Sequence, residues 1–320
     1  PKTAPRPRNS TAQTSATSQS RLSGLGGFSL SPVQTLSLLG GVRVEDTEVT
    51  ASGRLSDPRK PTVTRVTRDG NYRDLFPSFH LRYEQVPGLL LRASYSTGSA
   101  RPAFSDVYPV TTITYNTTSG LGQVRQSNPG LRPQFSDNYD VSVEYYFEPV
   151  GQLAVTLTER KVRNLFITDR LTAEEFGYTG DDELLGYEFI TTDNGPGTIR
   201  MRSMEWEYNQ SLSFLGALFR RLSVRASYTR LYAEVPRANL TPHLASGGIN
   251  YTYNRLNLYT NWNWTDDVNT NLAGTTFRRH RTNVDAGAGW RLSPTYSLSV
   301  SVRNLTDTPY INLQRFAGGL

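Results

Sequence analysis

Long stretches of strict apolar–polar alternation limit most strongly what this sequence can fold into. In one stretch Tyr139, Val141 and Val143 alternate with Asp140 and Ser142, so the two sets fall on opposite faces of a β-strand. About twelve such segments occur, most of them 10–15 residues long, at 21–30, 34–48, 75–86, 88–98, 138–148, 152–165, 197–210, 221–232, 243–254, 256–265, 280–292 and 296–307. Strands of globular proteins run to about 5–6 residues. A tilted membrane-spanning strand needs about 9–11, so the lengths favour strands that cross a membrane.

The connections between these segments alternate between short and long. Short turns are expected at residues 31–32, 87–88, 148–151, 254–255 and 293–295, with a somewhat longer one at 215–221. Long polar loops are expected at 49–74, 99–137, 166–196 and 266–279, with a shorter one at 233–242. A meander of this kind gathers its long loops on one side, as in barrels with short periplasmic turns and long extracellular loops. The sequence therefore predicts an all-β fold, an antiparallel up-and-down transmembrane β-barrel.

The composition fits a sheet with one wet face and excludes several classes of site. Hydrophobic residues make up 37% of the 320 residues and aromatic residues 11%. The absence of cysteine excludes a disulfide framework, cysteine-bound zinc and thiol catalysis. The net charge is +6, but the arginines are spread along the chain, so no nucleic-acid partner is expected. No apolar run approaches the roughly 20 residues of a membrane helix.

Three different motifs lie at the ends of alternating segments. Residues 75–109 contain paired strands followed by an Ala-Arg-Pro loop. Residues 127–151 contain Asn-Pro-x-Leu-x-Pro leading into Asn-Tyr-Asp and a strand. Residues 299–310 end in Arg-Asn-Leu-x-Asp-x-x-Tyr. The motif positions are Ala100, Arg101, Pro102, Asn128, Pro129, Leu131, Pro133, Asn138, Tyr139, Asp140, Arg303, Asn304, Leu305, Asp307 and Tyr310. In this order the motifs resemble the C-terminal half of TonB-dependent outer-membrane receptors, particularly the Caulobacter/Xanthomonas-type branch.

The resemblance implies a 22-stranded barrel plugged by an N-terminal globular domain and energised through the TonB complex. We expect residues 21–320 to supply about 12 of these strands, without the plug, the TonB box or the last strand, and residues 1–20 to be disordered or loop. The strands would lie in the lipid of the bacterial outer membrane. An incomplete barrel cannot close, so these residues should form an open, curved sheet with exposed edges.

The function implied by the resemblance is energy-coupled uptake of a scarce or bulky nutrient, either a carbohydrate or a ferric siderophore. Two alternatives remain open at this point. One is a passive outer-membrane pore without TonB coupling. The other is a secreted β-sandwich that binds carbohydrate, which would require shorter strands and a protein soluble without detergent.

No constellation of residues predicts catalysis, so we expect neither an enzyme nor a bound cofactor. The three histidines, His80, His243 and His280, are scattered without the spacing of metal ligands. The acidic residues 174–175 and 181–183 are typical of a solvated outer loop, and a cation site there is the less favoured interpretation.

Substrate contacts, if this part of the chain makes them, are expected from the loops at 99–137 and 166–196. Tyr108, Tyr115 and Tyr178 in these loops could stack on a sugar or an aromatic siderophore. Arg101, Arg132 and Arg303 belong to the family-like motifs. For Arg303, which alternates with a row of serines, we expect an inward orientation and a structural role rather than direct contact with substrate.

Overall fold

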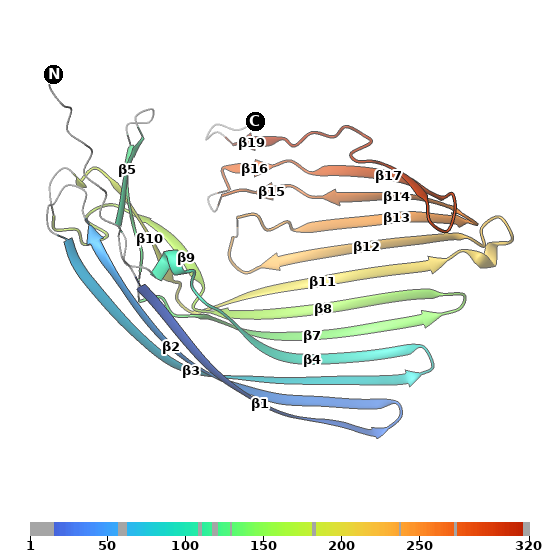
Figure 1. The fold of residues 1–320 in the computed structure, drawn as a ribbon, viewed down its shortest axis with the longest axis horizontal. Coiled ribbons are helices and arrows are strands. Elements are labelled where there is room, and N and C mark those ends of the chain that lie inside the picture. Colours follow the sequence, from blue (N-terminus) through green and yellow to red (C-terminus); the bar gives the residue numbers. More distant parts are fainter. Residues whose placement is uncertain are drawn as a thin grey trace.

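One large antiparallel sheet dominates the computed structural model, which describes residues 16–56, 63–107, 111–116, 121–128, 130–180, 184–236, 238–271 and 274–315. Twelve strands form this sheet in the order β1-β2-β3-β4-β7-β8-β11-β12-β13-β14-β17-β18 (Figure 1). Their bounds are β1 Ala16–Val33, β2 Leu36–Ser56, β3 Val63–Val86, β4 Leu89–Ala100, β7 Gln134–Phe147, β8 Gly151–Arg163, β11 Thr198–Ser211, β12 Leu222–Ala233, β13 His243–Tyr253, β14 Leu256–Thr265, β17 Arg281–Arg291 and β18 Ser297–Val302. Each of the twelve predicted segments corresponds to one of these strands, so the fold class is confirmed.

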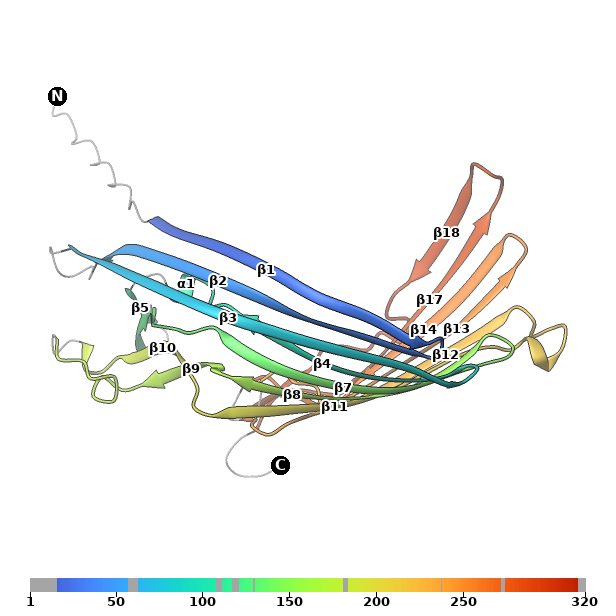
Figure 2. The ribbon, with the colours of Figure 1, turned by 90° about the horizontal axis from the view of Figure 1, so that it is seen from below.

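The sheet is strongly curved and does not close on itself. Seen from below, β8 and β11 lie lowest and the β1 edge and the β18 edge both rise above them, so the sheet forms a trough (Figure 2). No pairing joins β1 to β18 in the described residues. The open, curved sheet is the arrangement expected of a barrel of which only some strands are present.

Alternation along the strands produces two different faces, as two neighbouring rows across four strands illustrate. In one row Ala93, Val141, Leu157 and Met204 lie opposite one another on β4, β7, β8 and β11. The adjacent row contains Ser94, Asp140, Thr158 and Ser203. Asp140 accepts hydrogen bonds from the hydroxyls of Ser94 at 3.2 Å and Thr158 at 2.7 Å. The polar row is therefore cross-linked by side chains, whereas the apolar row is not.

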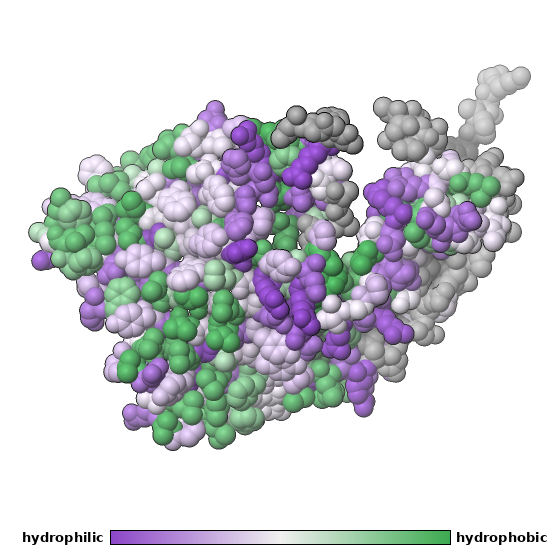
Figure 3. Space-filling view, turned by 180° about the vertical axis from the view of Figure 1, so that it is seen from behind, coloured by the Kyte–Doolittle hydropathy of each residue, from purple (hydrophilic) through white to green (hydrophobic). Residues whose placement is uncertain are grey.

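The apolar rows form the convex face, and much of their surface is uncovered. Val141 and Leu157 are each 52% exposed, and Trp206 is 44% exposed. Hydrophobic residues lie across much of the convex side of the strands (Figure 3). A single sheet with large exposed apolar side chains on its outer face would be poorly soluble in water, but it suits contact with lipid.

Short turns and long connections lie at opposite ends of the strands (Figure 1). The turn between β3 and β4 requires glycine, because Gly88 has φ 85° and an added Cβ would approach the Tyr146 carbonyl oxygen to 2.4 Å. The turn between β13 and β14 uses Asn254 at φ 50°. A longer turn between β11 and β12 contains the short 3₁₀ helix Ser213–Leu215. From β3 onward, the predicted alternation of short and long connections is confirmed.

The first three strands differ from the sequence-based expectation because they extend far beyond the expected bounds. β2 continues to Ser56 and β3 starts at Val63, paired residue by residue, so the long loop predicted at 49–74 is wrong. Residues 57–62 lie outside the described part of the chain. β1 begins at Ala16, earlier than the expected start at Arg21, while residues 1–15 are outside the described residues.

The long connections and the segment after β18 form two smaller sheets in the described part of the chain. The first, which we call the loop sheet, consists of β5 Thr111–Asn116, β6 Leu121–Gln126, β10 Glu188–Asn194 and β9 Phe166–Leu171, with the helical turn α1 Phe104–Val107 beside it. The second pairs β15 Val268–Asn269, β16 Thr276–Arg278 and β19 Asn312–Gln314. Within the described ranges, none of the helical segments has the length and apolar character needed to traverse a bilayer.

Candidate functional site

The loop sheet joins two connections that lie far apart in the sequence. β5 and β6 belong to the connection between β4 and β7, whereas β9 and β10 belong to the connection between β8 and β11. The junction is a parallel pairing of β6 with β10, in which Gln123 lies opposite Glu188 and donates to its carboxylate at 2.9 Å. The two loops are therefore one structural unit.

A small hydrophobic core holds the loop sheet together. Its buried members are Val124, Ala173, Leu184 and Phe189, of which Phe189 is only 1% exposed. The Phe189 ring packs against Phe176 at a centroid distance of 4.9 Å. Burial of a phenylalanine side chain stabilises a fold by about 1.5–3 kcal/mol. This core therefore stabilises the folded structure of the two loops.

The turn after β9 begins with a capping box. The Thr172 amide donates to the Glu175 carboxylate at 2.8 Å, the Thr172 hydroxyl donates to it at 3.0 Å, and the Glu175 amide donates back to that hydroxyl at 3.3 Å. Hydrogen bonds from Thr172 lower the pKa of Glu175, with the backbone amide having a larger effect than the side-chain hydroxyl. Glu175 is thus a turn-forming residue, which agrees with the prediction that the acidic residues 174–175 belong to a solvated loop.

The motif residue Asn128 connects α1 to β10. Its backbone amide donates to the Asp106 carbonyl at 2.7 Å, and its side-chain amide donates to the Thr192 carbonyl at 3.2 Å. Its side-chain oxygen accepts from the Gly130 amide at 2.9 Å, which fixes the following turn. Leu131 is 9% exposed and Pro133 is buried, while Pro129 lies outside the described residues.

The remainder of the second motif is tied to the neighbouring loop and strands. Asn194 accepts the Arg132 amide at 2.8 Å and donates to the Arg132 carbonyl at 3.0 Å, so Arg132 is held through its backbone. On β7, Asn138 accepts from Arg160 at 2.8 Å on β8. Tyr139 packs its ring against Tyr95 at 5.1 Å, whereas Asp140 belongs to the polar row of the concave face.

Arg101, from the Ala-Arg-Pro motif, reaches a buried carboxylate on β2. Its guanidinium donates to Glu45 at 2.8 Å and to the Thr47 hydroxyl at 3.3 Å. Glu45 is 3% exposed, and it also forms an ion pair with Arg43. Ala100 ends β4, and Pro102 directly follows the arginine. The contact pins the start of the long connection against β2, which is a structural role.

The third motif forms a turn folded back on β17. Asn304 has φ 52° and Asp307 has φ 48°, and the Asn304 side chain both accepts from and donates to the backbone of Thr308, at 3.1 and 3.2 Å. The Leu305 amide donates to the Val284 carbonyl at 2.7 Å. After this turn, the Tyr310 ring packs against the Arg281 guanidinium, whose central carbon lies 4.0 Å from the centroid of the ring.

Arg303 and the tyrosines proposed to stack on substrate differ from one another in their surroundings. Arg303 is exposed and makes no ion pair within the described ranges. The Tyr178 ring is half-buried and packs against Phe189 at 5.1 Å, so it contributes to the loop-sheet core. Tyr108 and the side chain of Tyr115 lie outside the described part of the chain.

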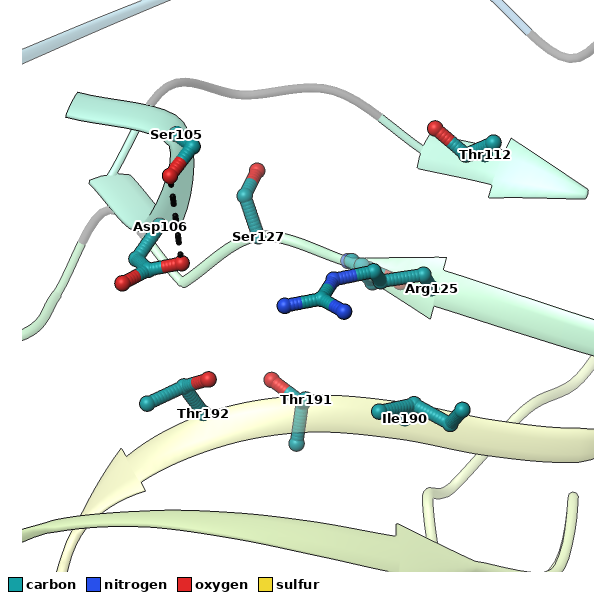
Figure 4. Close-up of a pocket in the computed structure, with 9 residues that line it drawn as sticks. Ser105, Asp106, Thr112, Arg125, Ser127, Ile190, Thr191 and Thr192 are labelled. Atoms are coloured by element: carbon teal, nitrogen blue, oxygen red, sulfur yellow. Dashed lines mark hydrogen bonds between the residues drawn. The ribbon is translucent and has the colours of Figure 1, made fainter. Parts of the chain in front are cut away.

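Several cavities lie on the concave side and among its loops. One of them, of about 380 Å³, lies on the polar face of the large sheet between residues of β3, β4 and β7, including His80, Arg92 and Asp140. Another, of about 340 Å³, lies on the loop sheet between α1, β6 and β10, and we call it the loop-sheet pocket (Figure 4). The described residues contain no group of three or more histidine or acidic side chains placed to hold a metal ion.

Comparisons with known proteins agree with this architecture. The model of the family described as TonB-dependent receptor-like β-barrel matches residues 1–305. The copper transporter OprC superposes with a TM-score of 0.68 at 12% identity, over 92% of this chain and 43% of that chain. The hemophore receptor HasR of Serratia marcescens gives 0.65 at 16% identity, over 92% and 49%. The siderophore receptor PiuA of Acinetobacter baumannii gives 0.65 at 14% identity, over 92% and 40%.

These likenesses concern the fold, because the identities are low. The chain spans less than half the length of each of these three structures. No match is found among curated protein sequences.

Proposed function

Because this chain belongs to the TonB-dependent receptor-like β-barrel family, we propose that it forms part of the wall and outer loops of a transporter for a scarce or bulky nutrient. Barrels of this family lie in the bacterial outer membrane. In the proposed mechanism, the loops capture the substrate at the cell surface. The TonB complex then acts on a plug domain inside the barrel to release the substrate inward.

The observation that carries this proposal is that the two faces of the sheet differ in polarity and its two ends differ in the length of their connections. The convex face is apolar and exposed, the concave face is polar, and the long connections gather at one end, where they fold into sheets of their own. Structured outer loops above a polar inner wall are suited to recognising a ligand before it enters the barrel.

The alternatives fit these observations less well. A secreted β-sandwich would cover the apolar face of this sheet with a second sheet, but the described residues leave side chains such as Leu157 and Val300 more than half exposed. A passive pore needs no joined loops, whereas here two connections share a core centred on Phe189. Both features favour a receptor in which loops bind a ligand.

Carbohydrate and ferric siderophore remain the two candidate substrates. The names of the structural neighbours include a copper transporter, a hemophore receptor and siderophore receptors, and each ligand belongs to that neighbour.

The test uses the native gene in its own organism. We expect deletion of the gene to abolish accumulation of one radiolabelled probe from a panel of neutral oligosaccharides and ferric siderophores. Accumulation in the parent strain should stop when TonB is deleted or a protonophore is added. Uptake that continues unchanged without TonB would refute active transport and favour a passive pore.

A further inference from the structure

The loop-sheet pocket contains two opposite charges that do not neutralise each other. Figure 4 shows the Arg125 guanidinium extending into the pocket between Ser127 and Thr191. Across the described residues, Arg125 makes no ion pair, and the Asp106 carboxylate accepts a single long hydrogen bond, 3.4 Å from the Ser105 hydroxyl. A guanidinium with free donors and a carboxylate with free acceptors therefore share one cavity.

This pairing of donors and acceptors selects for a particular ligand chemistry. The pocket has no net formal charge, so it does not attract an anionic iron chelate as a cluster of cations would. A hydroxyl group both donates and accepts, so adjacent hydroxyls of one ligand can serve Arg125 and Asp106 together. The side chains of Thr191 and Thr192 on β10 and Ser127 after β6 add further hydroxyls to the lining.

The walls of the pocket are held in place before any ligand arrives. Asn128 links the carbonyls of Asp106 and Thr192, which lie on two walls of the pocket. The floor includes Ile190, which is 7% exposed and lies next to the core residue Phe189. Polar groups fixed by a packed core and by neighbouring hydrogen bonds bind with little loss of conformational entropy.

We propose that the loop-sheet pocket is a binding site for a neutral polyhydroxylated group, such as one sugar unit of an oligosaccharide. Arg125 donates hydrogen bonds to its hydroxyls, and Asp106 accepts from them. The volume of about 340 Å³ is at the lower end for small-molecule sites, so the pocket holds one part of a larger substrate. The inference rests on the proposed function, because it makes the pocket a capture site on the outer loops.

Binding to the purified full-length protein in detergent tests the site. An array of neutral oligosaccharides identifies the tightest binder, and titration calorimetry then compares its affinity for the wild type and for Arg125→Met and Asp106→Asn. Each substitution removes charge-assisted hydrogen bonds, so we expect the dissociation constant to rise about 10- to 100-fold. Arg170→Met is the matched control, because Arg170 lies on β9 and pairs with Glu188 outside the pocket. Its affinity should stay within about twofold of the wild type.

The outcomes separate the pocket from the transporter. Binding of ferric enterobactin but of no neutral oligosaccharide overturns the inference, as does wild-type affinity in both pocket variants. Equal loss in the Arg170→Met control overturns it as well, because the effect would then belong to the whole sheet. Heat-modifiable gel mobility and the protease resistance of the loop sheet verify that each variant is folded. Oligosaccharide binding without TonB-dependent uptake would instead refute the proposed function and leave the site standing.

Discussion

The contact between Arg101 and Glu45 predicts a measurable coupling between the Ala-Arg-Pro motif and β2. The Glu45 side chain is 4% exposed and that of Arg101 is 29% exposed, with their atoms 2.8 Å apart. Removal of one partner from a buried ion pair costs about 3–5 kcal/mol, because a charge is left without compensation. Glu45 keeps its ion pair with Arg43 when Arg101 is replaced. We therefore expect a smaller loss of about 2 kcal/mol for Arg101→Met.

A double-mutant cycle isolates this interaction. The variants are Arg101→Met, Glu45→Gln and the combination, each in the full-length protein, with unfolding in urea followed by loss of heat-modifiable gel mobility. Residues in direct contact show coupling energies of about 0.5–3 kcal/mol, and we expect about 1–2 kcal/mol here. Arg73→Met provides the control. Arg73 pairs with Asp46 at 2.6 Å, but its side chain is 71% exposed, so solvent screens the pair and the loss of stability should be smaller than that of Arg101→Met.

Two results would refute this reasoning. Additive effects of Arg101→Met and Glu45→Gln, with a coupling energy below about 0.5 kcal/mol, would mean that the two side chains do not depend on each other. An equal loss of stability in Arg73→Met would mean that burial of the carboxylate does not set the size of the effect.

Three further predictions follow from the faces and turns of the structure. Val143→Arg, on the convex face, should cost about 2–4 kcal/mol in urea unfolding, whereas Ser142→Arg, on the concave face, should cost much less, and equal losses would contradict the assignment of faces. The pKa of Glu175 is lower in the folded loop than in the unfolded chain. The Glu175 carboxylate should therefore stabilise the loop fully above the unfolded pKa of about 4.3, and this stabilisation should be lost as the pH falls through the lower pKa of the folded loop. Hydrogen exchange of residues 172–178, corrected for intrinsic rates, should show this pH dependence in the wild type and lose it in Glu175→Gln. Asn304→Ala should destabilise the turn by about 1–2 kcal/mol and Asn304→Gly by less, because glycine tolerates φ 52° and alanine does not; thermal unfolding that ranks the two the other way would disprove this.

The large sheet was predictable from the sequence because a single physical rule acts along every strand. Where one face meets lipid and the other meets a polar interior, alternate residues must differ, as Val141 and Val143 differ from Asp140 and Ser142. The rule fails where both faces are wet. The outer part of the β2–β3 hairpin, around Thr50 and Asp69, pairs in regular register, although its sequence is polar enough to be interpreted as a loop.

The loop sheet could not be predicted in this way. β5 and β6 are six residues each, and nothing local to their sequences indicates that β6 pairs in parallel with β10. The motif residues were recognisable by their order in the chain, but their partners were not. Neither the role of Asn128 as a link between α1 and β10 nor the presence of Arg125 and Asp106 in one pocket follows from spacing. The parallel pairing and the contact of Asn128 with β10 join residues 65 and 64 positions apart, for which a single sequence carries no periodic signal.

The parallel pairing of β6 with β10 also sets an order of assembly. Gln123 and Glu188 are separated by 65 residues, and β7 and β8 lie between them in the chain. Closing so long a segment is entropically expensive unless the hairpin of β7 and β8 has already brought its two ends together. The loop sheet is therefore expected to form late, and to open as one cooperative unit in which neither loop loses its structure alone.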